Sequence, residues 1–304
     1  MSYWIVVSAC VACVVGLQAE PAGSREVAVV FTLTGDAWVT VPPAKEKNPI
    51  RLFQWLPEGA QVEVAPSGSL SLAFSSGARS ELHGGTLVRL ASSGPEVTKG
   101  TVRALERVPS LPRLFAIADA QAGVRAGAIR LRLGPDQGIH GLYPHAGATT
   151  LPDATVLRFR PVARAIYRVE LEDADGHMVF EEKTAVAAVA VPAGILKPGG
   201  SYYWRVSTLE TVRPALRSGS EFATLSEEGL RERAELRSTL EARVDAPSLA
   251  LLGEIDRRLG LLVEARDALR AALEKAPEDV ALRRALATLE VGLWAGAPTP
   301  GLSR

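Results

Sequence analysis

The stretch Leu-Lys-Pro-Gly-Gly-Ser-Tyr-Tyr-Trp-Arg-Val at residues 196–206 constrains the fold more than any other part of the chain. In it, Leu196 is followed by a Pro198-Gly199 turn and then by Tyr202. A β-sandwich fixes one of its corners with this pattern, because the tyrosine hydroxyl hydrogen-bonds the backbone of the turn. The sequence therefore predicts a tyrosine corner at Leu196, Pro198, Gly199 and Tyr202, with a β-sandwich around it.

The residues around this corner favour a complete sandwich over 139–225. After the turn, Tyr202, Trp204 and Val206 alternate with Tyr203 and Arg205, as in a strand with one buried face. The segment holds about seven short strand candidates, the number typical of an immunoglobulin-like sandwich. It resembles fibronectin type III modules at Phe159, Tyr167, Leu196, Pro198, Gly199, Tyr202 and Trp204. The resemblance implies a spacer or a binding platform without catalysis.

Length and charge limit the class of protein. A chain of 304 residues is long enough for about two or three domains. With 47% apolar and 22% charged residues, it has the composition of a folded chain. Its 34 basic and 34 acidic residues leave no basic excess for the phosphate contacts of a nucleic-acid binder. We therefore expect a multidomain globular protein that does not bind nucleic acid.

The N-terminal residues predict export. The apolar run Trp4–Leu17 is too short to span a bilayer and fits the core of a secretory signal. Residues 1–19 are therefore interpreted as a signal peptide that is cleaved after Ala19. The sequence Val-Ser-Ala-Cys ending at Cys10 also resembles the lipobox of bacterial lipoproteins, which makes Cys10 a candidate for lipidation. An uncleaved anchor and a misassigned start codon are two further interpretations of the same residues. We expect a periplasmic or secreted protein, lipid-anchored if Cys10 is modified.

Residues 26–108 contain short alternating runs separated by Gly turns, which predicts an antiparallel β-meander. The runs follow the pattern Leu56-x-x-Gly59-x-x-Val62, Ser69-x-x-x-Ala73-Phe74-x-x-Gly77, Leu82 and Val88-x-Leu90. This pattern resembles the extracytoplasmic FecR domain of bacteria, which implies a compact β-roll. Ala60 departs from the Asp that is usual there, and Ser76-Gly77-Ala78 stands in place of the usual Asp-Gly-Ser. The signalling role of the best-known members needs a cytoplasmic segment and a spanning helix, so we do not expect it here.

Residues 109–138 are punctuated by Pro and Gly and are interpreted as a linker together with the first strand of the next sheet. Within them, Leu114–Ala118 fits either one helical turn or a strand. Ala128–Leu133 alternates apolar and polar residues and fits the expected strand.

From residue 226 the pattern becomes helical, and we expect helices over 226–296 and a disordered tail over 297–304. Ser226 is a suitable N-cap. An apolar stripe follows at Leu230, Ala234, Leu236, Leu240 and Val244.

Residues 246–279 have the length of one helical-hairpin repeat. The repeat-defining positions are Leu249, Leu252, Gly253, Gly260, Ala265, Leu269, Ala272 and Pro277. They resemble a tetratricopeptide repeat, which implies two helices that pack closely at the small residues. Asp256 departs from the bulky residue that is usual there, and Val280–Leu293 fits a covering helix. Two interpretations of this region stay open: a self-contained bundle, and a surface that binds a peptide or protein.

Chemistry-bearing motifs are scarce. None of the four histidines has the spacing of a zinc site, and neither a nucleophile elbow nor a phosphate-binding loop occurs. We therefore expect no catalytic residues, no cofactor and no metal site.

These patterns predict a multidomain, mainly β protein with a FecR-like β-roll, a central fibronectin type III-like sandwich and C-terminal tetratricopeptide-like hairpins. Our hypothesis is a non-catalytic exported scaffold or adaptor of the cell envelope, which binds protein partners through its helical tail and β-modules. One rival is a peptidoglycan or polysaccharide binder that stacks Trp38, Trp55 or Tyr143 on sugar rings. The other is a membrane-tethered regulator of the FecR type.

Overall fold

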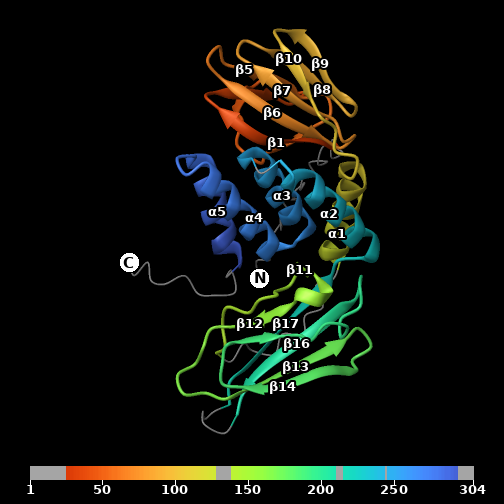
Figure 1. Cartoon of the computed structure of the whole chain (residues 1–304), viewed down its shortest axis with the longest axis vertical. Coiled ribbons are helices and arrows are strands. Elements are labelled where there is room, and N and C mark those ends of the chain that lie inside the picture. The colour runs from red at the N-terminus through yellow and green to blue at the C-terminus, as the bar shows by residue number, and fades with distance from the viewer. Residues whose placement is uncertain (1–24, 128–137, 210–214, 244, 294–304) are drawn as a thin grey trace, which may run out of the picture.

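The computed structural model describes residues 25–127, 138–209, 215–243 and 245–293. Two β-domains lie at opposite ends of the molecule, and a group of helices lies between them (Figure 1). The chain forms the first β-domain, one helix, the second β-domain and then four further helices. The C-terminal part of the described sequence therefore lies in the middle of the molecule. The coarse prediction of a mainly β, multidomain protein with helices is confirmed.

The first β-domain consists of two five-stranded antiparallel sheets with one hydrophobic core between them. The first sheet has the order β10-β7-β6-β1-β4, with β1 (Glu26–Thr34), β4 (Trp55–Pro57), β6 (Ser69–Phe74), β7 (Arg79–His83) and β10 (Val102–Leu105). The second has the order β3-β2-β5-β8-β9, with β2 (Ala37–Thr40), β3 (Asn48–Pro49), β5 (Gln61–Val64), β8 (Leu87–Ala91) and β9 (Gly94–Lys99).

Strand β1 is buried on both of its faces. Val27 and Val30 belong to the core between the two sheets. Val29 and Phe31 belong instead to a second core that includes the helices. A strand covered on both sides has no solvated face, which explains why β1 reads as a continuous apolar run and does not alternate.

The second β-domain carries seven strands in the described residues. A five-stranded sheet has the order β11-β17-β16-β13-β14, and β12 pairs with β15 in a separate ribbon. The bounds are β11 (Thr149–Thr150), β12 (Val156–Arg158), β13 (Tyr167–Asp173), β14 (Met178–Thr184), β15 (Ala188–Ala190), β16 (Ser201–Thr208) and β17 (Arg217–Thr224), with a short 3-10 helix η1 (Pro152–Ala154) after β11. Strands β11 and β17 are parallel, and the other neighbours are antiparallel.

The turn before β16 is hydrogen-bonded to the strand that follows it. The Tyr202 hydroxyl accepts a hydrogen bond from the backbone N–H of Lys197 at 2.7 Å. Along β16, burial alternates, and Trp204 is completely buried. The Trp204 indole N–H donates to the carbonyl of Pro144 at 2.9 Å. The strand is thus fixed at its start by the turn and at its centre by the core.

The segment 109–138 is not a plain linker, because it contains helix α1 (Leu111–Gly127). Leu111, Leu114, Phe115 and Ala118 are buried at the i, i+3, i+4, i+7 spacing of one helix face. The apolar stretch that fitted either a helical turn or a strand is therefore part of a long helix. The strand expected at 128–133 lies outside the described residues.

The remaining helices follow in the last part of the chain. They are α2 (Glu227–Glu241), α3 (Ala246–Leu259), α4 (Leu262–Lys275) and α5 (Val280–Leu293). Helices α2 and α3 begin at side-chain caps. The Ser226 hydroxyl accepts from the backbone N–H of Gly229, and the Asp245 carboxylate caps α3 in the same way. Gly260 ends α3 with φ +80°, a left-handed conformation that glycine adopts without steric cost.

The buried face of α2 differs from the expected apolar stripe. Leu236 and Leu240 are buried as expected, but Ala234 is exposed and Val244 lies outside the described residues. The buried face instead includes Glu232 and Arg233. Apolar periodicity misplaces this face because two of its positions are charged residues that find ionic partners on neighbouring helices.

Candidate functional site

The core that joins the first β-domain to the helices is the main junction of the molecule. It combines Val29, Phe31 and Ala73 of the first sheet with buried residues of α1, α2 and α3. The helical members are Leu111, Leu114, Phe115, Ala118, Leu236, Leu240, Leu251, Leu252, Ile255 and Leu259. Helices from two distant parts of the sequence therefore share one core with a β-sheet, and the helical region is not an independent tail.

Helices α3 and α4 form a closely packed antiparallel hairpin (Figure 1). Of the repeat-defining positions, Pro277 is exposed, and the buried ones are Leu249, Leu252, Gly253, Gly260, Ala265, Leu269 and Ala272. A Cβ atom at Gly253 would lie 2.9 Å from Cδ2 of Leu269 and 3.1 Å from the carbonyl oxygen of Ala265. The two helices thus approach at a point where only glycine fits without a shift of the neighbours.

Asp256 takes part in a buried ion pair with α2. Its carboxylate accepts from Nε and Nη2 of Arg233 at 2.7 and 2.8 Å. The Asp256 side chain is completely buried, and that of Arg233 is 9% exposed. The polar residue that departs from the repeat pattern is therefore explained by its partner, which lies 23 residues earlier in the chain.

One face of α3 carries charged residues toward the first β-domain. The completely buried Glu254 accepts from the Trp55 indole N–H at 2.6 Å and from two nitrogens of Arg257, each at 2.7 Å. The Arg258 guanidinium lies over the Trp55 ring, 4.4 Å from its centroid, and pairs with Glu26 at 2.7 Å. Burial raises the pKa of the Glu254 carboxyl, and the bonds from Arg257 and Trp55 oppose this rise.

Helix α1 is tied to the other helices by further ion pairs. Arg113 of α1 pairs with the buried Glu232 of α2 at 2.7 Å, and this bond holds the pKa of Glu232 below its ordinary value. Arg258 of α3 also pairs with Asp119 of α1 at 3.0 Å. No local motif in the sequence indicates this network, because the paired residues of α1, α2 and α3 lie far apart in the chain.

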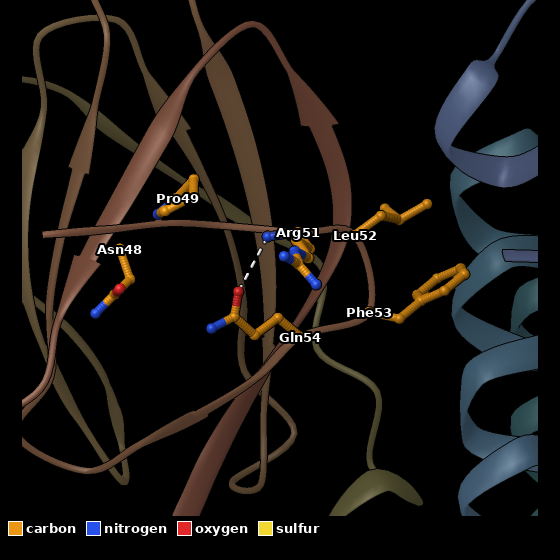
Figure 2. Close-up of a pocket in the computed structure, with 6 residues that line it drawn as sticks. All are labelled: Asn48, Pro49, Arg51, Leu52, Phe53 and Gln54. Carbon is orange, nitrogen blue, oxygen red and sulfur yellow. Dashed lines mark hydrogen bonds between the residues drawn. The ribbon is translucent and has the colours of Figure 1, made fainter. Parts of the chain in front are cut away.

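The loop between β3 and β4 brings two apolar side chains to the helices. Leu52 and Phe53 are half-buried and pack against a cluster of α3, α4 and α5. Figure 2 shows both side chains pointing toward the helices, away from the side chains of Asn48 and Gln54. Phe53 has φ +62°, which places a non-glycine residue in the left-handed region.

The helices also contact the second β-domain. The backbone N–H of Thr149 donates to the carbonyl of Gly260 at 2.9 Å. Tyr143 lies in a small buried cluster with Leu293, against which Leu262 and Val263 pack. Burial, with a smaller contribution from the Glu264 carboxylate, raises the pKa of the Tyr143 hydroxyl. Both β-domains are thus held by the same helical hairpin.

Two of the aromatic residues considered for sugar stacking are unsuited to it. Trp55 donates a hydrogen bond to Glu254 and lies under the Arg258 guanidinium. Its ring also packs against Phe115, with 4.7 Å between the two ring centroids. Tyr143 is 5% exposed. Their faces are therefore used in contacts between domains. Trp38 is half-buried on β2.

In the described ranges, one group of side chains has the proximity needed for metal ligation: Asp173, Asp175 and His177, whose ligand atoms lie within 4.8 Å of one another. Asp173 ends β13, and Asp175 and His177 lie in the turn that leads to β14. Oδ1 of Asp173 accepts from the backbone N–H groups of Asp175 and His177, and the bond from His177 is the main cause of its lowered pKa. These contacts are those of an ordinary Asp-capped turn.

The predicted signal peptide and Cys10 lie outside the described residues, as does the predicted tail. Among the residues that the structure describes, no helix combines the length and the apolar character needed to cross a lipid bilayer.

Comparison with known proteins gives no family. No family model matches the chain, and no curated protein matches it. CopC from Methylosinus trichosporium OB3b is a structural neighbour over 30% of this chain and 95% of that chain, with 17% identity and a TM-score of 0.23. A two-domain fibronectin type III segment from chicken tenascin is another, over 67% and 87%, with 11% identity and a TM-score of 0.22.

Proposed function

We propose that this protein is a non-catalytic, exported scaffold of the bacterial cell envelope that binds a protein partner. In this proposal, residues 26–108 are a FecR-like domain, 139–225 a fibronectin type III-like sandwich and 246–279 a tetratricopeptide-like hairpin. The observation that carries the proposal is the central position of the helices, which share one core with the first β-domain and contact the second. A chain built in this way connects two β-modules through one group of helices.

Helix α5 is the part of the helical region best placed to meet a partner. It lies at the edge of the group, whereas α3 is enclosed by its neighbours (Figure 1). Val280 and Val291 are 60% and 74% exposed. Eleven residues make close to three helical turns, so both side chains lie on one face, and the exposed Ala287 lies between them. We infer that this face of α5, which also carries the exposed Arg284 one turn after Val280, contacts the partner.

A pulldown from envelope extracts tests the proposal. Removal of all helices is unsuitable, because it would expose the apolar faces of β1 and β6. The intact mature chain is therefore compared with Val280→Asp/Val291→Asp. The matched control is Val186→Asp, which changes an equally exposed valine of the second β-domain. We expect the intact chain and the control to recover the same envelope protein and the α5 variant to lose it.

Equal recovery by all three proteins would remove α5 from the binding role. Absence of any specific partner for the intact chain would contradict the scaffold proposal itself. Sedimentation with purified cell-wall sacculi separates this proposal from its polysaccharide-binding rival, because a protein-binding scaffold stays in the supernatant.

A further inference from the structure

The tip of the β3–β4 loop, Leu52 and Phe53, makes its side-chain contacts outside its own domain. Neither residue belongs to the core between the two sheets. Both pack against the helical cluster, which we define as Leu249, Ala250, Ala265, Leu269, Ala272, Leu282 and Leu289. The first β-domain thus packs an aliphatic and an aromatic side chain against the apolar core of α3, α4 and α5.

The backbone of the tip is held in a conformation that its sequence disfavours. The backbone N–H of Phe53 donates to the carbonyl of Val30 at 2.8 Å, and the N–H of Val30 donates to the carbonyl of Gln54 at 3.1 Å. These two bonds hold Phe53 at φ +62°, where a Cβ atom is crowded by its own backbone. Strain of this kind persists where surrounding contacts compensate for it and is concentrated at switches and binding sites.

An open depression of about 460 Å³ lies inside the loop and is lined by Asn48, Pro49, Arg51 and Gln54 together with the tip itself. Leu52 and Phe53 are only half-buried against the helices. Trp55, by contrast, is anchored by its bond to Glu254 and by the pairing of β4 with β1. Movement is therefore expected at Leu52 and Phe53 and not at Trp55.

We propose that the Leu52–Phe53 tip is an internal ligand of the helical cluster, and that an extended segment of a partner protein competes for the same surface. The chemistry of the partner segment is given by the tip: a large aliphatic residue followed by an aromatic one. The chain then has a closed state, in which its own loop covers the cluster, and an open state, in which the cluster binds the partner. This inference rests on the proposed function only in that a protein partner exists.

The test uses a labelled peptide with the sequence of residues 48–57, Asn-Pro-Ile-Arg-Leu-Phe-Gln-Trp-Leu-Pro. It is titrated by fluorescence anisotropy against the native chain and against Leu52→Ser/Phe53→Gly. Glycine at position 53 suits the left-handed backbone, so the variant removes both side chains without added strain. The matched control is Val97→Ser, which changes an exposed valine of the same β-domain on β9. A second peptide carries Ser-Gly in place of Leu-Phe.

We expect the tip variant to bind the native-sequence peptide at least about tenfold more tightly than the native chain and the control do, because the apparent affinity is reduced by the fraction of closed molecules. The Ser-Gly peptide should bind none of them. Equal affinity for the native chain and the folded tip variant would overturn the proposal, as would no binding of the native-sequence peptide to that variant.

If the tip variant does not fold, hydrogen exchange on the native chain tests whether the peptide displaces the tip. With excess native-sequence peptide, the backbone amide of Phe53 should exchange faster, because its bond to Val30 is released as the tip withdraws. Unchanged exchange at saturating peptide would refute the displacement. Both tests are independent of the pulldown, because neither of them uses the α5 variant.

Discussion

Replacing Asp256 by alanine tests the role of the buried ion pair between α2 and α3. The substitution leaves the Arg233 guanidinium, 9% exposed, without its bidentate partner. Breaking a buried pair by removing one member costs about 3–5 kcal/mol. We expect the lower end of this range, because the charge of Glu264 also acts on Arg233. For a chain of 304 residues, a loss of about 3 kcal/mol lowers the melting temperature by roughly 5 °C.

The decisive comparison is with Arg233→Leu/Asp256→Leu, which replaces the pair by apolar side chains. Apolar replacement of a whole buried pair is often neutral or stabilising, so this variant should recover most of the loss. Urea unfolding is followed by Trp fluorescence and by circular dichroism, and the first transition is compared among the three proteins, because a multidomain chain need not unfold in one step. A loss below about 1 kcal/mol in Asp256→Ala, or a double variant as unstable as the single one, would refute the reasoning.

Three further predictions concern single contacts. Burial raises the pKa of Glu254, so the folded chain holds that proton more tightly than the unfolded chain. As the pH rises from the ordinary pKa of a glutamate carboxyl through the raised pKa of Glu254, the native chain should therefore lose stability relative to Glu254→Gln. Urea unfolding of both proteins at a series of pH values measures this difference. Gly253→Ala should cost about 1–3 kcal/mol in thermal unfolding, because its Cβ would meet Leu269, whereas Gly292→Ala, which meets nothing within 4 Å, should not destabilise the chain. Tyr202→Phe removes the acceptor of a turn N–H and should lower the free energy of unfolding by about 0.5–1.5 kcal/mol, and an unchanged value would contradict the corner.

Local patterns in the sequence are sufficient to place most of the β-structure. Strand β16 alternates because one of its faces is solvated, and its turn is specified by residues that are adjacent in sequence. Helix α1 is harder to predict, because the segment that contains it is bounded by Pro and Gly and its apolar stretch fits either a helix or a strand. Leu114 and Phe115 contact a core that also contains residues of α2 and α3, and these contacts stabilise the segment as a helix. Helices α2 and α3 lie far later in the chain. No local signal reports such contacts.

The junction could not be predicted for the same reason. Glu254 accepts from Trp55 across 199 positions of the chain, and Arg113 pairs with Glu232 across 119. From the sequence alone, each of these residues is expected to be an ordinary solvated side chain or part of a local strand. One indication is nevertheless present. Asp256, a charged residue on the otherwise apolar face of a helix, is costly unless a partner is buried with it. A charged residue that needs a buried partner favours helices that are enclosed by other elements over helices that form a free tail.

The enclosed position of α3 changes how a partner could use the helices. A hairpin that stood alone could offer the face of Glu254 and Arg258 to a peptide, but here that face is covered by Trp55 and strand β1. The exposed side of α5 and the position of the half-buried Leu52 and Phe53 are the two apolar routes considered for a partner. The two routes have different consequences for the β-domains. Binding at α5 leaves their arrangement unchanged, whereas displacement of the tip loosens one contact between the first β-domain and the helices and so couples partner binding to the relation between the two domains.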